Sequence, residues 1–202
     1  VMAQFNYKHG EQITDKYFPK KYSETPVWIT EISDVTPLDT SIQDGLKWAV
    51  TFHNYLTKAN VNAIIWWGGA MPTSNNESLI ILNKNRKDYT LSKRYDILGN
   101  YSRYISEGST RIQVTQPKNK DLLVSAYKKN DKYILVAINL SEKTISTNIR
   151  LDGANIKGAL KQFITNKDNR WNKTNIVPVS NKYYNLTIPQ FSIVTLVGKV
   201  HL

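Results

Sequence analysis

Apolar and polar residues alternate with two different periods in the first third of the chain. The runs Val27–Ile32 and Asn62–Trp67 have the length and the β-branched and aromatic content of strands. Between them, the segment 41–59 can be capped by Ser41 or Asp44, and its apolar residues cover most of a helical circumference. The pattern predicts a β-α-β unit whose helix packs between a sheet and another element.

Three further segments complete this first part. Val1–Tyr7 has the pattern of another strand, and the segment 10–26 that follows has no sustained periodicity, which favours a loop. Gly68–Lys93 is rich in Asn and Ser and predicts a long polar loop. The next stretch, Tyr95–Ser106, predicts a second helix that ends before Gly108.

The remaining chain changes character and predicts an antiparallel β-sandwich. Short β-rich runs recur there, separated by turn signals such as Asn130-Asp131 and Asp152-Gly153. The predicted strands are Leu122–Tyr127, Tyr133–Asn139, Thr144–Leu151, Gly158–Thr165, Tyr183–Ile188 and Val194–Val197. The division of the chain into a β/α part and an all-β part follows from this change.

Composition and charge exclude some chemistry and leave other chemistry open. The 27 basic and 16 acidic residues give a formal net charge of +11, but the lysines are scattered, which favours a solvated basic surface. The chain has no cysteine, and its three histidines are too dispersed to form a metal site. We therefore expect no cofactor or metal. The first ten residues lack the pattern of a signal peptide, so any export signal is expected elsewhere.

Candidate catalytic chemistry lies at the predicted strand ends. Glu31 closes one strand, Trp66-Trp67 the next, and Tyr7 the first, and side chains at the carboxyl ends of parallel strands share one rim. Aromatic faces stack on sugar rings, and a carboxylate can attack an anomeric carbon. The alternative is a polar residue that ends a strand beside aromatic core residues. Trp28 alternates with Glu31 and is expected to pack towards the helices.

Four motifs in order resemble glycoside hydrolase family 30, particularly its bacterial glucuronoxylanase and xylanase branch. They are VWITEIS (Val27–Ser33), NAIIWWGGA (Asn62–Ala70), YDILGNYSRYISEGSTRI (Tyr95–Ile112) and VSAYKKNDKYILVAINLS (Val124–Ser141). The resemblance implies a secreted xylan-degrading enzyme with a (β/α)8 TIM barrel and a β-sandwich side domain. Residues 1–108 would then be barrel strands six to eight with their helices, and residues 109–202 the antiparallel β-sandwich.

The resemblance also implies roles for individual residues. Glu31 would be the catalytic nucleophile, Tyr7 would hydrogen-bond to it, and Trp67, with Trp66 as a weaker candidate, would bind the substrate sugar. Phe5 stands where the family often has a histidine, which leaves the hydrogen bonding around Tyr7 open. His9 follows the same strand and is read mainly as a surface residue.

The chain is too short to hold the whole catalytic machinery that the resemblance implies. A barrel alone takes roughly 250 residues, and the family's acid/base, an Asn-Glu pair after strand four, would precede Val1. Asn76-Glu77 repeats this dipeptide after the predicted strand eight, in the wrong place, and is interpreted as solvated loop. We expect a complementary N-terminal barrel fragment as the partner that completes the enzyme.

Specificity and function keep alternatives at this stage. No arginine lies between Thr30 and Leu82, so a fixed clamp for the glucuronate branch is not expected, and cleavage of xylan should depend weakly on glucuronate. One alternative is a non-catalytic carbohydrate-binding fragment that uses the aromatics Tyr127, Tyr133, Trp171, Tyr183 and Tyr184, among which Trp171 is the best exposed candidate. A basic nucleic-acid binder is the other alternative. Neither nucleic acid nor a membrane is expected as a partner.

Overall fold

The computed structural model describes residues 2–6, 25–85, 87–152, 155–156, 158–179 and 183–201. The chain divides into two compact units, residues 1–95 and residues 96–202. The division falls within the second helix, earlier than the boundary after residue 108 that the sequence suggested. Among the described residues, no helix is long and apolar enough to span a membrane.

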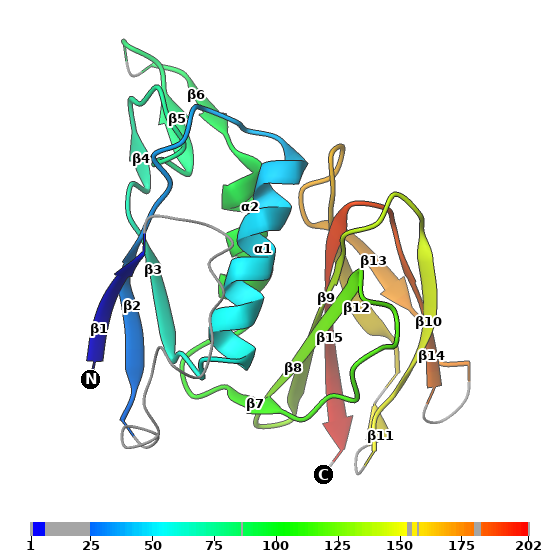
Figure 1. Cartoon of the computed structure of the whole chain (residues 1–202). Helices are drawn as coiled ribbons and strands as arrows, with labels where there is room; N and C mark the ends of the chain where they lie inside the picture. The colour runs from blue at the N-terminus through cyan, green and yellow to red at the C-terminus, as the bar shows by residue number, and fades with distance from the viewer. Residues whose placement is uncertain are drawn as a thin grey trace. The chain divides into compact units, whose positions relative to one another are not determined.

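The first unit contains a parallel three-stranded sheet with one helix along one face (Figure 1). Its strands are β1 (Met2–Asn6), β2 (Val27–Ile32) and β3 (Ala63–Trp66), in the order β1-β2-β3, and α1 (Ile42–Thr57) connects the last two. This arrangement confirms the predicted β-α-β unit. Strand β2 has the predicted bounds.

Helix α1 begins where the sequence allowed and is buried over most of its surface. Ser41 is the N-cap, and its side chain accepts a hydrogen bond from the backbone N–H of Asp44 at 3.3 Å. Trp48, Phe52 and Tyr55 are among its fully buried residues. Asp44 does not cap the helix, because its carboxylate is used in a buried ion pair described below.

The segment expected as a long loop contains a small sheet of its own. Strands β4 (Ala70–Met71), β5 (Ile80–Leu82) and β6 (Tyr89–Leu91) pair in sequence order. These strands are only two or three residues long, which is too short for an alternating pattern to show in the sequence. Helix α2 (Lys93–Ser102) follows at once and starts and ends earlier than predicted.

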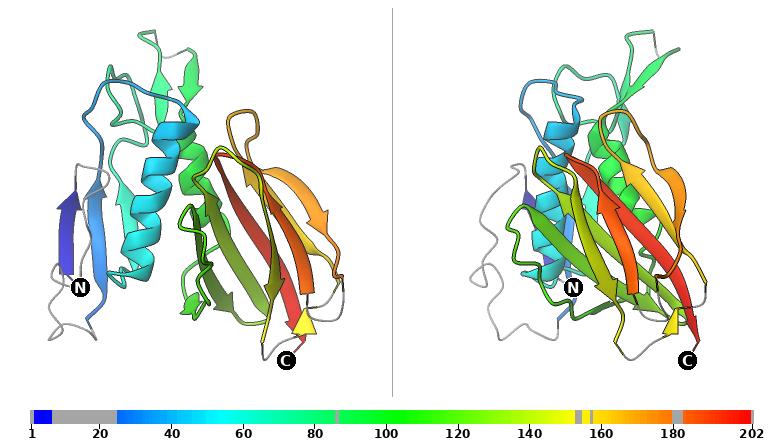
Figure 2. Two further views of the ribbon diagram at one scale, coloured as in Figure 1. Left: turned by 45° about the vertical axis from the view of Figure 1, so that its right-hand side comes forward. Right: turned by 90° about the vertical axis from the view of Figure 1, so that its right-hand side faces the viewer.

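The second unit consists of two antiparallel sheets packed face to face (Figure 2). The larger, seven-stranded sheet has the order β13-β12-β15-β9-β8-β7, with β11 paired to β15, and the smaller sheet is the pair β10–β14. The bounds are β7 (Thr110–Ile112), β8 (Leu122–Lys129), β9 (Lys132–Asn139), β10 (Ile145–Arg150), β11 (Asn155–Ile156), β12 (Leu160–Thr165), β13 (Asn172–Ile176), β14 (Tyr183–Ile188) and β15 (Ser192–His201).

A single apolar core joins the two sheets of the second unit. Tyr184, Leu186 and Ile188 from β14 share a buried cluster with residues of the large sheet such as Ala137 and Val194. Every second residue of β14 is buried and the residues between them are exposed, as expected for a strand with one face on a core. The sequence predicted six of these nine strands, whereas β7, β11 and β13 were not expected.

Residues 96–102 of α2 belong to this second unit and are joined to the large sheet by buried polar contacts. The side-chain amide of Asn100 donates to the hydroxyl oxygen of Thr195 at 3.1 Å and accepts from the hydroxyl of Thr165 at 2.7 Å. The Thr195 hydroxyl also donates to the backbone oxygen of Asn100 at 2.8 Å. All three side chains are fully buried, so these bonds satisfy groups that would otherwise be costly to bury.

Candidate active site

A one-residue bulge in β2 sets the direction of Glu31. On one side of β2, Gln4 pairs with Ile29 and Phe5 with Glu31, so Thr30 is an extra residue. On the other side of β2, Ile29 pairs with Ile64 and Ile32 pairs with Trp66, so three residues along β2 match two along β3. A bulge reverses the alternation of side chains beyond it, which is one way in which sheets aim residues at functional sites.

The face of this sheet that α1 covers contains Ile29 and Ile32, both fully buried on either side of the bulge. Trp66 is paired with Ile32 and lies on the same face, where only 8% of it is exposed. Its ring packs edge-on against Trp48 of α1, with centroids 4.6 Å apart, and its indole N–H donates to the backbone oxygen of Glu77 at 2.7 Å. Trp66 is therefore a core residue behind the sheet.

The opposite face of β2 and β3, which we call the exposed face, carries Trp28, Glu31, Ile65 and Trp67. Glu31 directly precedes the buried Ile32 and so points to the other side, while Ile65 and Trp67 alternate with Trp66. The exposed fractions are 40% for Trp28, 47% for Ile65 and 52% for Trp67. Glu31 and Trp67 thus share one face at the carboxyl ends of neighbouring strands.

The expectation that Trp28 packs towards the helix is wrong. Strict alternation would place Trp28 and Glu31, three residues apart, on opposite faces of the strand. The extra residue, Thr30, lies between them and brings both side chains to the same face of the sheet. Val27 and Ile29, rather than Trp28, are on the helix side. No signal in the sequence of β2 marks the bulge, because it is defined only by the pairing with β1 and β3.

Two residues proposed around the site, Tyr7 and His9, lie outside the described residues. The described part of β1 ends at Asn6, and its Phe5 is paired with Glu31. The contact between Tyr7 and Glu31 that the family resemblance implies therefore stays a prediction.

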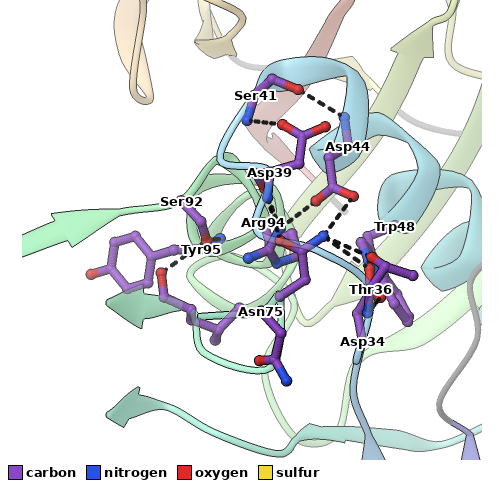
Figure 3. A network of polar contacts seen from close by, with 12 residues as sticks. Asp34, Thr36, Asp39, Ser41, Asp44, Trp48, Asn75, Ser92, Arg94 and Tyr95 are labelled. Atoms are coloured by element: carbon purple, nitrogen blue, oxygen red, sulfur yellow. Dashed lines mark hydrogen bonds and ion pairs between the residues drawn. The ribbon is translucent and has the colours of Figure 1, made fainter. Parts of the chain in front are cut away.

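The loop after β2 and the segment between β4 and β5 are joined by a buried polar network centred on Asn76. Figure 3 labels several of its other members, among them Asp34, Asp44 and Arg94. The Asn76 side-chain N–H group donates to Asp34 at 3.3 Å, to the Thr36 hydroxyl at 3.1 Å and to Asp44 at 3.4 Å. Its side-chain oxygen accepts from the backbone N–H of Asp39 at 2.7 Å. Asn76 is almost fully buried, so the expectation of a solvated loop is wrong for this residue.

Arg94 supplies the positive charge of the network. Its guanidinium forms an ion pair with Asp44, and it also donates to the backbone oxygens of Asp39 at 2.6 Å and Ser78 at 3.3 Å. Both Arg94 and Asp44 are buried. These bonds connect the start of α2 to the start of α1, so Arg94 has a structural role that no local pattern in the sequence indicates.

The pKa values of the three aspartates in the network are shifted in different directions. Burial alone would raise the pKa of Asp34, but hydrogen bonds from Thr36, Trp48 and Asn76 outweigh it and hold the pKa below its ordinary value. Hydrogen bonds from Ser41 likewise lower the pKa of Asp39. Desolvation raises the pKa of Asp44 despite its pairing with Arg94. A hydrogen-bonded Asp34 therefore stays ionised directly after the strand that carries Glu31.

Among the residues that the structure describes, no group of three or more His, Cys, Asp or Glu side chains could hold a metal ion. The acidic residues near Glu31 are engaged with amide, indole and guanidinium donors instead.

A carbohydrate-binding fragment would need exposed aromatic residues. In the second unit, most of the candidate aromatics are instead buried or packed against neighbouring residues. Tyr127 and Tyr184 are buried, and Tyr133 is half-buried below the ammonium group of Lys128. Trp171 is not the exposed platform that was expected, because its indole packs on α2 where Gly99 leaves room and its N–H donates to the backbone oxygen of Asp96 at 2.8 Å. Tyr183 alone of the five is exposed.

Comparison with known proteins gives one consistent relationship. No family profile matches the chain. A curated relative, the glucuronoxylanase XynC of Bacillus subtilis (strain 168), is 25% identical over 201 residues, which cover 94% of this chain and 44% of the relative. A second curated glucuronoxylanase XynC of Bacillus subtilis is 23% identical over 203 residues, covering 95% of this chain and 44% of the relative.

Solved structures agree with the sequence comparison. The family 30 subfamily 8 xylanase Xyn30A from Clostridium acetobutylicum superposes with a TM-score of 0.79 at 23% identity, covering 98% of this chain and 49% of that one. A family 30 endoxylanase from Clostridium papyrosolvens C71 gives 0.77 at 21% identity with the same coverage. The chain thus spans about half the length of these relatives. The resemblance to glycoside hydrolase family 30 is confirmed, and along almost its whole length the chain is similar to about half of a family 30 xylanase.

Proposed function

We propose that this chain is the nucleophile-bearing half of an endo-β-1,4-xylanase of the retaining type. The observation that carries the proposal is the bulge in β2, which turns Glu31 to the same face as Trp67, at the carboxyl ends of two parallel strands. A carboxylate beside an exposed indole suits a site that attacks one sugar ring and stacks on it. The similarity to glucuronoxylanases and xylanases supplies the substrate class.

The architecture that we infer is a (β/α)8 TIM barrel with a β-sandwich side domain. Strands β1, β2 and β3 would be barrel strands six, seven and eight, and the second unit would be the side domain. In a barrel, the side of each strand away from the helices faces the interior, which accounts for the apolar residues on the exposed face. The other strands would cover that face, whether they belong to the same polypeptide or to a separate N-terminal fragment.

The chemistry requires two carboxyl groups roughly 5 Å apart. Glu31 would attack the anomeric carbon and form a glycosyl-enzyme bond, while an acid in the other half protonates the departing glycosidic oxygen. That same group, now a base, would take a proton from water as the water releases the sugar and restores Glu31. Tyr7 would hydrogen-bond to the Glu31 carboxylate, and Trp67 would form one wall around the attacked sugar.

Trp66 has a supporting part in this proposal. Its ring lies in the core against α1, and its hydrogen bond to the Glu77 backbone fixes the loop that follows Trp67. We infer that Trp66 acts on the substrate only through the position of its neighbour. No cofactor or metal is needed for this reaction.

The proposed enzyme cleaves xylan with weak dependence on glucuronate branches. The segment between Thr30 and Leu82, which includes the loops after the two strands of the site, contains no arginine. The next arginine that the structure describes, Arg94, is buried and paired with Asp44, so it is not available to a substrate carboxylate. Activity on a plant polysaccharide also fits an enzyme that works outside the cell.

The test is release of reducing sugar from unsubstituted and from glucuronate-substituted xylan by the chain combined with the remaining N-terminal half. Wild type should cleave both substrates, and Glu31→Gln should lose activity by orders of magnitude because an amide cannot form the glycosyl-enzyme bond. Glu77→Gln is the matched control, since Glu77 lies in the loop and is half-exposed. Its variant should keep nearly full activity.

Two outcomes would contradict the proposal in different ways. Unchanged hydrolysis by Glu31→Gln would remove Glu31 as the nucleophile, and cleavage restricted to glucuronate-bearing xylan would remove the proposed specificity. A completed protein that binds xylan but cleaves neither substrate would favour the carbohydrate-binding fragment instead.

A further inference from the structure

The outward face of the strand pair β10–β14 carries a row of exposed polar side chains. The residues of the two strands that point away from the core face one another in three cross-strand pairs, Ser146 with Thr187, Asn148 with Asn185 and Arg150 with Tyr183. All six are exposed. We call them the outer row. The residues between them, such as Tyr184 and Leu186, form the core.

The outer row presents no uncompensated charge, although the chain contains 27 lysines and arginines. Its only ionisable cation, Arg150, is held by Asp152 through two bonds, from Nε to Oδ1 at 2.8 Å and from Nη2 to Oδ2 at 2.9 Å. The other groups that it offers are two amides, two hydroxyls and a phenol. Such groups exchange hydrogen bonds with neutral hydroxyls and give no attraction to a polyanion.

An aromatic ring stands at one end of the row. Tyr183 is 42% exposed, whereas its neighbour Tyr184 is 1% exposed and donates its hydroxyl to the backbone oxygen of Gly158 at 2.9 Å. Arg150 Nη1 donates to the Tyr183 hydroxyl oxygen at 3.4 Å, so the same guanidinium that Asp152 orients also restrains the ring. Val179 adjoins it, because its backbone N–H donates to the Tyr183 backbone oxygen at 2.9 Å.

We propose that the outer row is a second carbohydrate-binding site, which takes the unsubstituted backbone of xylan. The ring of Tyr183 stacks on one xylose, and the Asn148–Asn185 and Ser146–Thr187 pairs bind hydroxyls further along the polymer. The six residues are held on two hydrogen-bonded strands, and the one cation among them is paired with Asp152, so binding orders few side chains. The identity of the polymer rests on the proposed function, while the preference for a neutral glycan rests on the residues themselves.

The test uses the full chain in native gels that contain soluble, glucuronate-free xylan, run towards the cathode because the net charge is +11. All samples carry Trp67→Ala, which removes the aromatic wall of the proposed catalytic site. In this background, Tyr183→Ala should weaken the retardation by xylan by about three- to tenfold. Tyr183→Phe keeps the ring and should retain most of it, and the double variant N148A/N185A should weaken it as well.

Tyr89→Ala is the matched control, because Tyr89 is an even more exposed tyrosine on β6 of the other unit. It should migrate like the parent chain. The proposal is overturned if the parent is not retarded, if Tyr183→Ala is retarded as strongly as the parent, or if Tyr89→Ala has an equal effect. Self-association of the parent through this face, seen as a larger particle that Tyr183→Ala dissolves, would assign the outer row to a second copy instead.

A separate measurement keeps this inference apart from the proposed catalysis. Hydrolysis of short xylooligosaccharides by the completed enzyme, with Trp67 intact, should be unchanged in Tyr183→Ala, because Tyr183 has no part in the proposed catalytic step. If Tyr183→Ala loses retardation by xylan but keeps its hydrolysis of oligosaccharides, the result supports the outer row as a separate xylan-binding site. Retardation without any hydrolysis in the parent would leave the outer row standing and remove the catalytic proposal.

Discussion

The two units bury their sheets in different ways. In the second unit, the inner face of the large sheet is closed by β10 and β14 over a continuous apolar core. In the first unit, α1 covers one face of the parallel sheet, while Trp28, Ile65 and Trp67 on the other face stay substantially exposed. Parallel sheets in known folds are covered on both faces. The second unit thus holds its own core, whereas one face of the parallel sheet in the first unit keeps large apolar side chains exposed.

The largest effect that would test this comparison is expected from Arg94→Met in the first unit. The variant leaves the buried Asp44 carboxylate without its ion pair, which should lower the free energy of unfolding by about 3–5 kcal/mol. Urea unfolding followed by tryptophan fluorescence measures it, since four of the five tryptophans lie in this unit. Arg150→Met, which breaks an exposed pair in the second unit, should change stability little. Equal losses in both variants would contradict the assignment of Arg94.

A core truncation in the second unit tests whether its core is its own. Leu186→Ala should lower the free energy of unfolding of that unit by about 3 kcal/mol, because the side chain is almost fully buried between the two sheets. Circular dichroism reports both units, and tryptophan fluorescence reports mainly the first. The fluorescence transition should stay in place. If it moves together with the sheet transition, the units unfold as one and the contrast between them fails.

Gly99→Ala tests the packing of Trp171 on α2. An alanine Cβ would lie 2.3 Å from Cζ2 of Trp171, so the variant should destabilise the second unit by about 1–3 kcal/mol. On an open helix surface the same change would stabilise by up to about 1 kcal/mol, so the sign decides the matter. Gly69→Ala, where no atom lies within 4 Å of the added carbon, is the control. Melting temperatures of both variants suffice.

The smallest effect concerns the exposed face itself. Ile65→Thr in the chain alone should change the free energy of unfolding by less than about 0.5 kcal/mol, because the side chain is exposed and threonine suits a strand. In the complete barrel the same variant should cost more than about 1 kcal/mol, since Ile65 would then be buried. A large loss in the chain alone would mean that the exposed face already has a covering partner within these 202 residues.

Much of the fold follows from local patterns. The bounds of β2, the position of α1 with Ser41 as its cap, and six strands of the second unit agree with the sequence pattern. Strands of two or three residues, such as β4 and β11, were missed because so few residues carry no periodicity. Strand ends and family motifs predict Glu31 and Trp67 as site residues, and the structure brings both to one face.

Errors arose where a residue's surroundings depend on distant partners. The polar neighbours of Asn76 in sequence predict a solvated loop residue, yet it is buried because Asp34, Thr36 and Asp44, which are 42, 40 and 32 residues away in sequence, converge on it. Trp171 lies in a polar loop, yet its ring packs against α2, because Gly99 has no side chain to block it. A residue with polar neighbours in sequence is therefore exposed to solvent only when no group from a distant part of the sequence packs against it.

The sequence by itself determined the order of the longer elements, the succession of a β/α part and an all-β part, and the similarity to family 30 xylanases, because periodicity, capping and motifs are written in consecutive residues. Tertiary structure alone decided which face each side chain of β2 and β3 occupies. The bulge at Thr30 exists only in the pairing with two neighbouring strands, and it moves Trp28 to the face of Glu31 while Trp66 lies behind the sheet. A strand's own alternation cannot contain a register that its neighbours impose.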